Sequence, residues 1–196
     1  ADLLAGSDPV EHLGDRSGDP SVGRRDQHRR GDGCTGVPLR GARTDQCDFG
    51  IVADSGSDLA GIAQLSKAAT ALKVTPLVIA PTGGVLKSGR RSVTIDRTFA
   101  TARSIEFDTV VVAGGTTSTD IKLILLLQEA FRHCKSIAAW GDGTAVLEAA
   151  RIPLKAPGVS VAESVDKNFT ATLAAELGKH RAWDRAPKVM ASAVSP

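Results

Sequence analysis

The sequence predicts an α/β domain in which helices cover both faces of a mostly parallel sheet. Short runs of consecutive apolar residues alternate along the chain with longer segments whose apolar residues recur at helical spacing. The apolar runs are continuous, which is typical of strands that are buried on both faces. Together these observations favour a doubly wound, flavodoxin-like sheet.

The apolar runs predict the strands of this sheet, which we expect at residues 49–53, 74–80, 108–113, 136–140 and 159–161. Segments with helical periodicity predict helices between the strands. Ser57 or Asp58 can cap the first helix. The later helices are expected at residues 120–133, 144–150 and 168–179. Residues 85–86 and 92–95 are expected to pair as a small hairpin.

Residues 1–48 differ in composition from the rest of the chain. They are rich in Arg, Gly, Asp and Pro, contain neither Lys nor an aromatic residue, and keep no apolar periodicity. Such a segment buries too little apolar area to offset its chain entropy, so we expect it to be disordered or weakly ordered. A start outside the reading frame of the following domain would also produce this composition. The α/β domain is then expected over residues 49–180, and a C-terminal tail over residues 181–196.

Charge and cysteine content exclude several classes of partner and site. The formal net charge of the 196 residues is +2, which gives no electrostatic reason to expect nucleic acid or an anionic membrane as partner. The cluster from Arg25 to Arg30 lies in a segment with interleaved Asp residues, which favours a solvated charge run over a nucleic-acid patch. Cys34, Cys47 and Cys134 lack the spacing of a disulfide framework or a zinc site.

The apolar runs of the sequence also bear on whether the chain could span a membrane or begin with a signal peptide. No run approaches the roughly 18 apolar residues of a membrane span, and the first residues lack the layout of a signal peptide. The expectation is therefore a cytoplasmic protein without a membrane partner.

Glycine-rich turns follow the strands, where doubly wound sheets bind small ligands. They lie at residues 54–56, 114–116 and 141–143. The turn Gly141-Asp142-Gly143 leads from a strand into a helix, yet its tip offers no thiol, hydroxyl or imidazole. Neither a phosphate loop nor a serine-hydrolase elbow is present, and Val146 replaces the third glycine of a dinucleotide motif. Backbone amides at Gly114, Gly115 and Gly143 remain weak candidates for ligand binding.

Several stretches of the chain carry a family resemblance that extends from about Phe49 to Pro187. They are VTIDRTFA (93–100), FDTVVVAGG (107–115), IAAWGD (137–142) and HRAWDRAP (180–187). On these stretches the chain resembles the C-terminal domain of large-subunit, hydroperoxidase II-type haem catalases. That domain is similar to the DJ-1/PfpI group of the class I glutamine amidotransferase-like superfamily.

The resemblance implies a domain without catalysis of its own. In the wider superfamily a Cys followed by His occupies the elbow, at positions that fall on Gly141 and Asp142 here, and an acidic partner falls near Ser55. Glycine supplies no nucleophile, so the set is vestigial. We expect no metal and no cofactor in this chain.

The haem belongs to the parent catalase. Haem catalases bind iron through a tyrosine, and the chain contains none. By the same resemblance the expected partners are a catalase core domain and the other subunits of a homotetramer. The expected role is structural: packing on the core, supporting the oligomer and framing access to the haem channel. Trp183 would pack either against a neighbour or on its own domain.

Two other functions stay open at this point. The chain could be a stand-alone DJ-1/PfpI-like hydrolase or glyoxalase-type enzyme that uses Cys134 or Asp142. It could also be a small-molecule-binding sensor module that uses the amides of the glycine turns.

Overall fold

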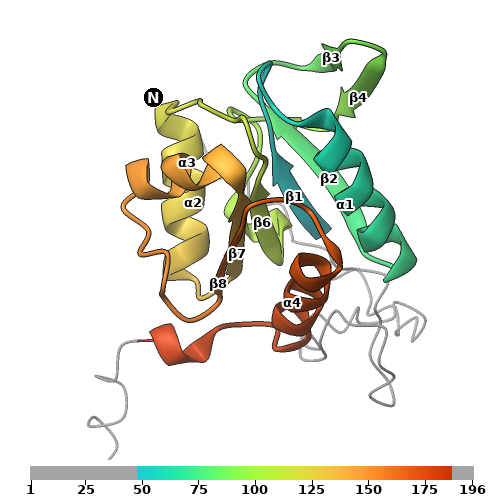
Figure 1. Ribbon diagram of the computed structural model, residues 1–196. Coiled ribbons are helices and arrows are strands. Elements are labelled where there is room, and N and C mark those ends of the chain that lie inside the picture. The colour runs from blue at the N-terminus through green and yellow to red at the C-terminus, as the bar shows by residue number, and fades with distance from the viewer. Residues whose placement is uncertain (1–47, 187–196) are drawn as a thin grey trace, which may run out of the picture. The chain divides into compact units, whose positions relative to one another are not determined.

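A parallel six-stranded sheet forms the centre of the domain (Figure 1). The structure, a computed structural model, describes residues 48–186. The strand order is β5-β2-β1-β6-β7-β8, and every neighbouring pair within this sheet is parallel. The strands are β1 (Asp48–Val52), β2 (Thr75–Ala80), β5 (Arg97–Thr98), β6 (Thr109–Val112), β7 (Ser136–Trp140) and β8 (Val159–Ala162). The predicted α/β class and parallel sheet are confirmed.

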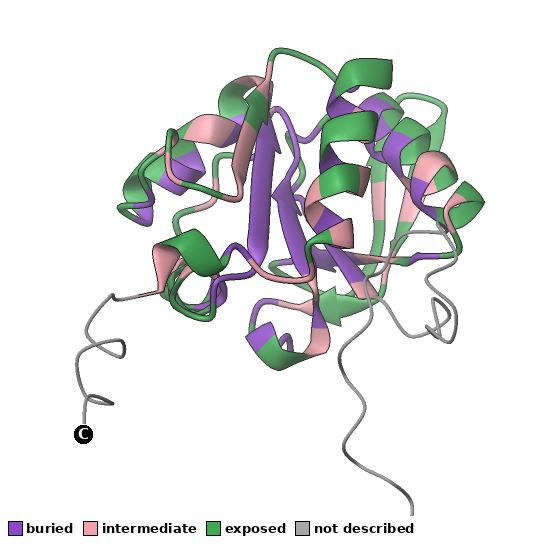
Figure 2. Ribbon diagram, turned by 90° about the horizontal axis from the view of Figure 1, so that it is seen from below, coloured by how far each residue is buried: buried purple, intermediate pink, exposed green. Residues whose placement is uncertain are grey.

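Helices cover both faces of this sheet. They are α1 (Leu59–Ala71), α2 (Ile121–Arg132), α3 (Thr144–Ala149) and α4 (Lys167–Gly178). Two apolar clusters separate the faces: α1 and α4 pack on one, and α2 and α3 pack on the other. Successive residues of β6 alternate between the clusters, with Val111 in the first and Val110 and Val112 in the second. Figure 2 shows the strands buried between helices whose outer sides are exposed.

The predicted elements agree with the observed ones within one or two residues at their ends. The predicted β7 matches in both bounds. Asp58 caps α1, accepting a hydrogen bond of 3.0 Å from the amide of Ala60, whereas Ser57 is buried and has another role. Sequence patterns did not reveal β5, because two residues are too few for a periodic signal. No helix within residues 48–186 is long and apolar enough to cross a bilayer.

A two-stranded antiparallel ribbon projects from the end of β2, as predicted. It consists of β3 (Gly84–Ser88) and β4 (Arg91–Ile95). Gly89 turns the chain with a φ of +58°, a conformation that glycine adopts without steric cost. Leu86 and Val93 pack against the α1 side of the core and hold the ribbon in place.

Only parts of the two terminal segments lie in the described range. Of residues 1–48, predicted to be weakly ordered, Asp48 alone is described, and it is ordered as the first residue of β1. The remainder lies outside the described residues. Of the predicted tail 181–196, the described part ends at Ala186 and contains the short 3-10 turn η4 (Trp183–Arg185).

The described part of the tail is fixed to its own domain by its arginines. Nη2 of Arg185 donates to the carbonyl of Lys135, and its guanidinium lies 4.5 Å from the ring centroid of Phe131. Burial away from water lowers the pKa of Arg185. Trp183, by contrast, is 67% exposed, so the alternative in which it packs on its own domain is wrong.

Asp48 in β1 makes the stability of the folded domain depend on pH. Burial, and next the neighbouring Asp108 carboxylate, raise the pKa of Asp48 above its usual 3.8. The folded state therefore binds this proton more tightly than the unfolded chain, and stability is lost as the pH rises through the raised pKa.

We expect Asp48→Asn to stabilise the chain at pH 7, because it removes the unfavourable charge beside Asp108. The gain should be less than about 1 kcal/mol, because solvent screens these two partly exposed carboxylates from each other. The gain should disappear as the pH falls below 3.8, where Asp48 is protonated in both states. Urea unfolding across this pH range measures it. An equal gain at every pH would contradict the electrostatic explanation.

Candidate functional site

The glycine turns meet at the carboxyl edge of the sheet, because β1, β6 and β7 are parallel neighbours. A Cβ atom added to Gly141 would lie 3.7 Å from the Cα of Gly114. The amide of Asp58 donates to the carbonyl of Gly114 at 2.8 Å, which joins the start of α1 to the loop after β6. The structure thus brings together the sequence-predicted positions at this edge.

Asp54 organises this edge, although its sequence context predicts only a turn. Its carboxylate is buried and accepts hydrogen bonds on both oxygens. Oδ2 accepts from the amides of Thr117 at 2.8 Å and Ser118 at 3.0 Å. Oδ1 accepts from the amide of Gly56 at 2.9 Å and the hydroxyl of Ser57 at 3.3 Å. An ionised acceptor makes these bonds roughly twice as strong as neutral ones.

Two buried hydroxyl groups continue the network beneath Asp54. Ser57 Oγ accepts from the amide of Asp54 at 2.7 Å and shares a hydrogen bond of 2.8 Å with Thr116 Oγ1. Thr116 Oγ1 also lies 3.4 Å from the carbonyl oxygen of Val52, which is an alternative acceptor for its proton. The ends of β1 and β6 are therefore connected by side chains as well as by the strand ladder. We call Asp54, Ser57 and Thr116 the Asp54 network.

The elbow after β7 packs against the backbone of β6 at its second glycine. Gly141 has a φ of +53° and opens the 3-10 turn η3 (Gly141–Gly143), which runs directly into α3. Gly143 is buried, and a Cβ atom there would lie 2.6 Å from the carbonyl oxygen of Ala113 and 2.9 Å from that of Val112. Close packing of the elbow against β6 therefore requires glycine at 143.

The side chain of Trp140 fills the space on the α1 side of the carboxyl edge. Its indole is 2% exposed and meets the ring of Phe169 edge-on, with centroids 6.3 Å apart. A Cβ atom added to Gly114 would lie 2.9 Å from the indole, and one added to Gly61 would lie 3.1 Å from it. These glycines make room for the ring, so Gly114 has a packing reason of its own.

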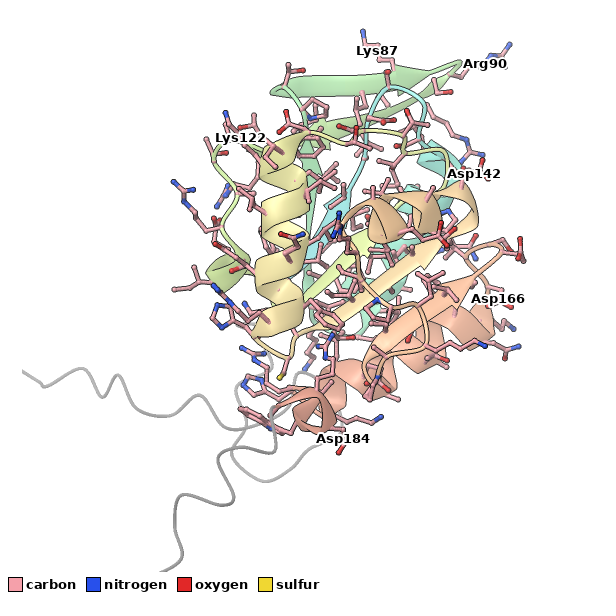
Figure 3. The ribbon with its side chains drawn as sticks, turned by 90° about the vertical axis from the view of Figure 1, so that its left-hand side faces the viewer. Lys87, Arg90, Lys122, Asp142, Asp166 and Asp184 are labelled. Carbon is pink, nitrogen blue, oxygen red and sulfur yellow. The ribbon has the colours of Figure 1, made fainter. Side chains whose placement is uncertain are left out.

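The remaining candidate residues do not assemble into a catalytic set. Asp142 and Ser55 are exposed, as Figure 3 shows for the side chain of Asp142 at the surface. Cys134 is buried before β7, at the opposite end of the strand from the elbow. Within residues 48–186 no cluster of three or more His, Cys, Asp or Glu side chains could bind a metal ion.

Three backbone amides at this edge are already engaged by the Asp54 carboxylate. Gly56, Thr117 and Ser118 direct their N–H groups at Asp54. Turns of this kind bind anions in many proteins, and here the chain supplies the anion itself. One sequence signal could have identified Asp54: an acidic residue directly after a buried strand and before Ser-Gly-Ser is typical of a side chain that caps a turn.

Comparisons with known proteins agree on one family. The family model of the C-terminal domain found in long catalases matches residues 45–187. "Catalase HPII" of Mycobacterium avium is 30% identical over 155 residues, which cover 69% of this chain and 22% of that protein. "Catalase B" of Aspergillus fumigatus is 31% identical over 125 residues, which cover 53% of this chain and 17% of that protein. The matched part of the chain thus spans about a fifth of each relative.

We expect Asp54→Ala to destabilise the chain by about 3 kcal/mol, because three backbone amides lose a charged acceptor. Asp142→Ala is the matched control; this exposed carboxylate should change the unfolding free energy by no more than about 0.5 kcal/mol. Urea denaturation of the three proteins measures both effects. Equal stability of Asp54→Ala and the parent chain would show that the network is dispensable.

Gly143→Ala should cost about 2 kcal/mol, because the added methyl group meets backbone carbonyls that cannot move without displacing β6. Gly83→Ala is the control, since the nearest atom to an added Cβ there is 4.0 Å away. Thermal unfolding of both variants distinguishes them. A fully stable Gly143→Ala variant would mean that the elbow is looser than the structure shows.

Proposed function

The chain belongs to the family of C-terminal domains of long catalases, and from this premise we propose that it is a non-catalytic structural domain of a large-subunit catalase. The observation that carries the proposal is the elbow after β7, where Gly141 stands at the nucleophile position and supplies no reactive side chain. The parent enzyme would decompose hydrogen peroxide, as the names of the relatives indicate for those proteins.

We further propose that the domain is a member of the class I glutamine amidotransferase-like, DJ-1/PfpI group with a flavodoxin-like sheet. The strand order supports this. Apart from the short edge strand β5, the order β2-β1-β6-β7-β8 corresponds to 2-1-3-4-5, the order of flavodoxin-like sheets. The elbow also lies at the end of β7, as a nucleophile elbow would in that group.

Haem chemistry would take place elsewhere in the parent enzyme. The chain contains no tyrosine to bind the iron of a catalase haem, so its residues do not fit this group. What the domain would contribute is contact with the catalase core and support for a homotetramer. Its cytoplasmic location stays a prediction.

The tail supplies a candidate contact. Trp183 is large, apolar and 67% exposed, and it lies between Arg181 and Arg185, both of which are tied to the domain. Arg181 pairs with Asp108 at 3.4 Å. An exposed tryptophan on a fixed backbone binds at a low entropic cost, and tryptophan is enriched among residues that dominate interface energies. We propose that Trp183 docks on the catalase core or a neighbouring subunit.

The alternatives are less well supported. A stand-alone enzyme based on Cys134 would need that thiol near the elbow, whereas it is buried at the other end of β7. A sensor that used the amides of Gly114, Gly115 and Gly143 gains no support from the Asp54 network, which engages the amides of Gly56, Thr117 and Ser118 instead. Assays of the purified chain with methylglyoxal and amide substrates should show no turnover.

A chimera tests the structural role. We would replace the C-terminal domain of the Mycobacterium avium catalase HPII by residues 45–187 of this chain. The chimera should lose activity at a temperature about 5 °C or more above that of an enzyme truncated before the domain, because a bound domain stabilises the folded core. A chimera no more heat-stable than the truncated enzyme would contradict the proposal.

Trp183→Ala tests the proposed docking contact itself. In the isolated chain it should change the unfolding free energy by at most about 0.5 kcal/mol, because the side chain is exposed. In the chimera it should remove most of the heat stability that the domain confers. Ile121→Ala, at a residue that is 65% exposed at the start of α2, is the control and should have no effect in either setting.

A further inference from the structure

The β3–β4 ribbon carries a concentration of positive charge. Lys87, Arg90 and Arg91 are all exposed, and residues 81–95 contain no Asp or Glu. None of the three forms a salt bridge with another residue in the described range. We call these three side chains the basic hairpin.

Negative charge gathers at the other side of the same carboxyl edge. Asp142 lies in the elbow after β7, Glu163 follows β8, and Asp166 caps α4 through the amide of Phe169. These acids are exposed, and within residues 48–186 they too lack salt-bridge partners. The neighbouring Lys167 leaves their net charge negative. We call Asp142, Glu163 and Asp166 the acidic rim.

The sheet keeps the two groups apart within one molecule. β2, from which the basic hairpin projects, is three strands away from β7, which corresponds to about 14 Å at the usual strand spacing. Figure 3 shows Arg90, Asp142 and Asp166 directed to the same side of the molecule, with Lys122 on the opposite side. When two groups of opposite charge lie side by side on one face, a two-fold rotation places the basic group of one copy against the acidic group of the other.

An exposed apolar side chain close in sequence to each group could contact the other group. Val85 of β3 is 50% exposed and Val161 of β8 is 46% exposed. Val85 stands two residues before Lys87, and Val161 two residues before Glu163. An apolar contact within a charged boundary is the usual anatomy of a protein interface.

We propose that the basic hairpin of one copy docks on the acidic rim of a second copy, so that the chain self-associates through two equivalent contacts. Leu86 and Val93 anchor the ribbon to the core, so the three cations are presented on a backbone that is ordered before binding. The interface depends on charge complementarity, which also makes it sensitive to salt. The inference goes beyond the catalase proposal and requires no catalase core.

Sedimentation velocity of the full chain tests the proposal. A concentration-dependent dimer is expected at about 50 mM NaCl, with its dissociation constant rising about tenfold or more at about 500 mM because salt screens exposed charges. A chain that is monomeric throughout, or a dimer that salt does not weaken, would overturn the proposal.

Charge reversal identifies the surfaces. The variant K87E/R90E/R91E and the variant D142K/E163K should each raise the dissociation constant about 100-fold or more, because like charges then face each other. An equimolar mixture of the two variants should dimerise again, since each then meets its opposite charge. Recovery in the mixture also shows that both variants are folded. K122E/R132E reverses exposed charges on α2 and should leave the dimer intact.

Other outcomes are decisive as well. A dimer unaffected by either reversal would place the contact elsewhere, and two folded variants that stay monomeric when mixed would exclude the reciprocal pairing. A monomeric chain whose catalase chimera loses heat stability on K87E/R90E/R91E would assign the basic hairpin to the core instead of a second copy. The chimera and Trp183→Ala results do not depend on dimerisation, so the two proposals can fail separately.

Discussion

The carboxyl edge of this sheet depends on one buried carboxylate. Asp54 accepts hydrogen bonds from three backbone amides on two loops and so joins the segment after β1 to the segment after β6. Loops at the ends of parallel strands leave amides without ladder partners, and an unpaired amide is costly once it is removed from water. The chain satisfies them with its own anion, where many doubly wound proteins use a bound ligand.

Side chains and backbone occupy space at the carboxyl edge where related folds bind small ligands. Trp140 occupies the space beside Gly61 and Gly114, and Gly143 brings the elbow against the carbonyls of β6. With backbone and indole in those places, the surfaces that we propose to bind partners consist of exposed side chains. The basic hairpin and acidic rim lie at the carboxyl edge, whereas Trp183 lies at the other end of the strands, near the residues that precede β6 and β7. Figure 1 shows the ribbon and the tail at opposite ends of the sheet.

The sequence predicted the elements well because the core residues have strong periodic signals. Continuous apolar runs such as residues 136–140 are unambiguous, and helix starts are marked by Asp58, Asp120 and Asp166, each of which caps its helix through a backbone amide. The Asp54 network was not predicted, because it joins residues 59 to 64 positions apart and only the fold brings them together. The exposure of Trp183 is unpredictable from the sequence for a similar reason, because it depends on arginine contacts with Phe131, Lys135 and Asp108 that no local pattern encodes.

Hydrogen exchange at Thr117 and Ser118 tests the central claim most directly. Thr117 is exposed, so its amide would exchange quickly unless the Asp54 carboxylate binds it. In amide exchange followed by NMR, these two amides should be protected at least about 100-fold relative to a free peptide, and Asp54→Asn should remove most of that protection. Exchange at free-peptide rates in the parent chain would contradict the account, because the carboxyl edge would then be open and its amides free for a ligand.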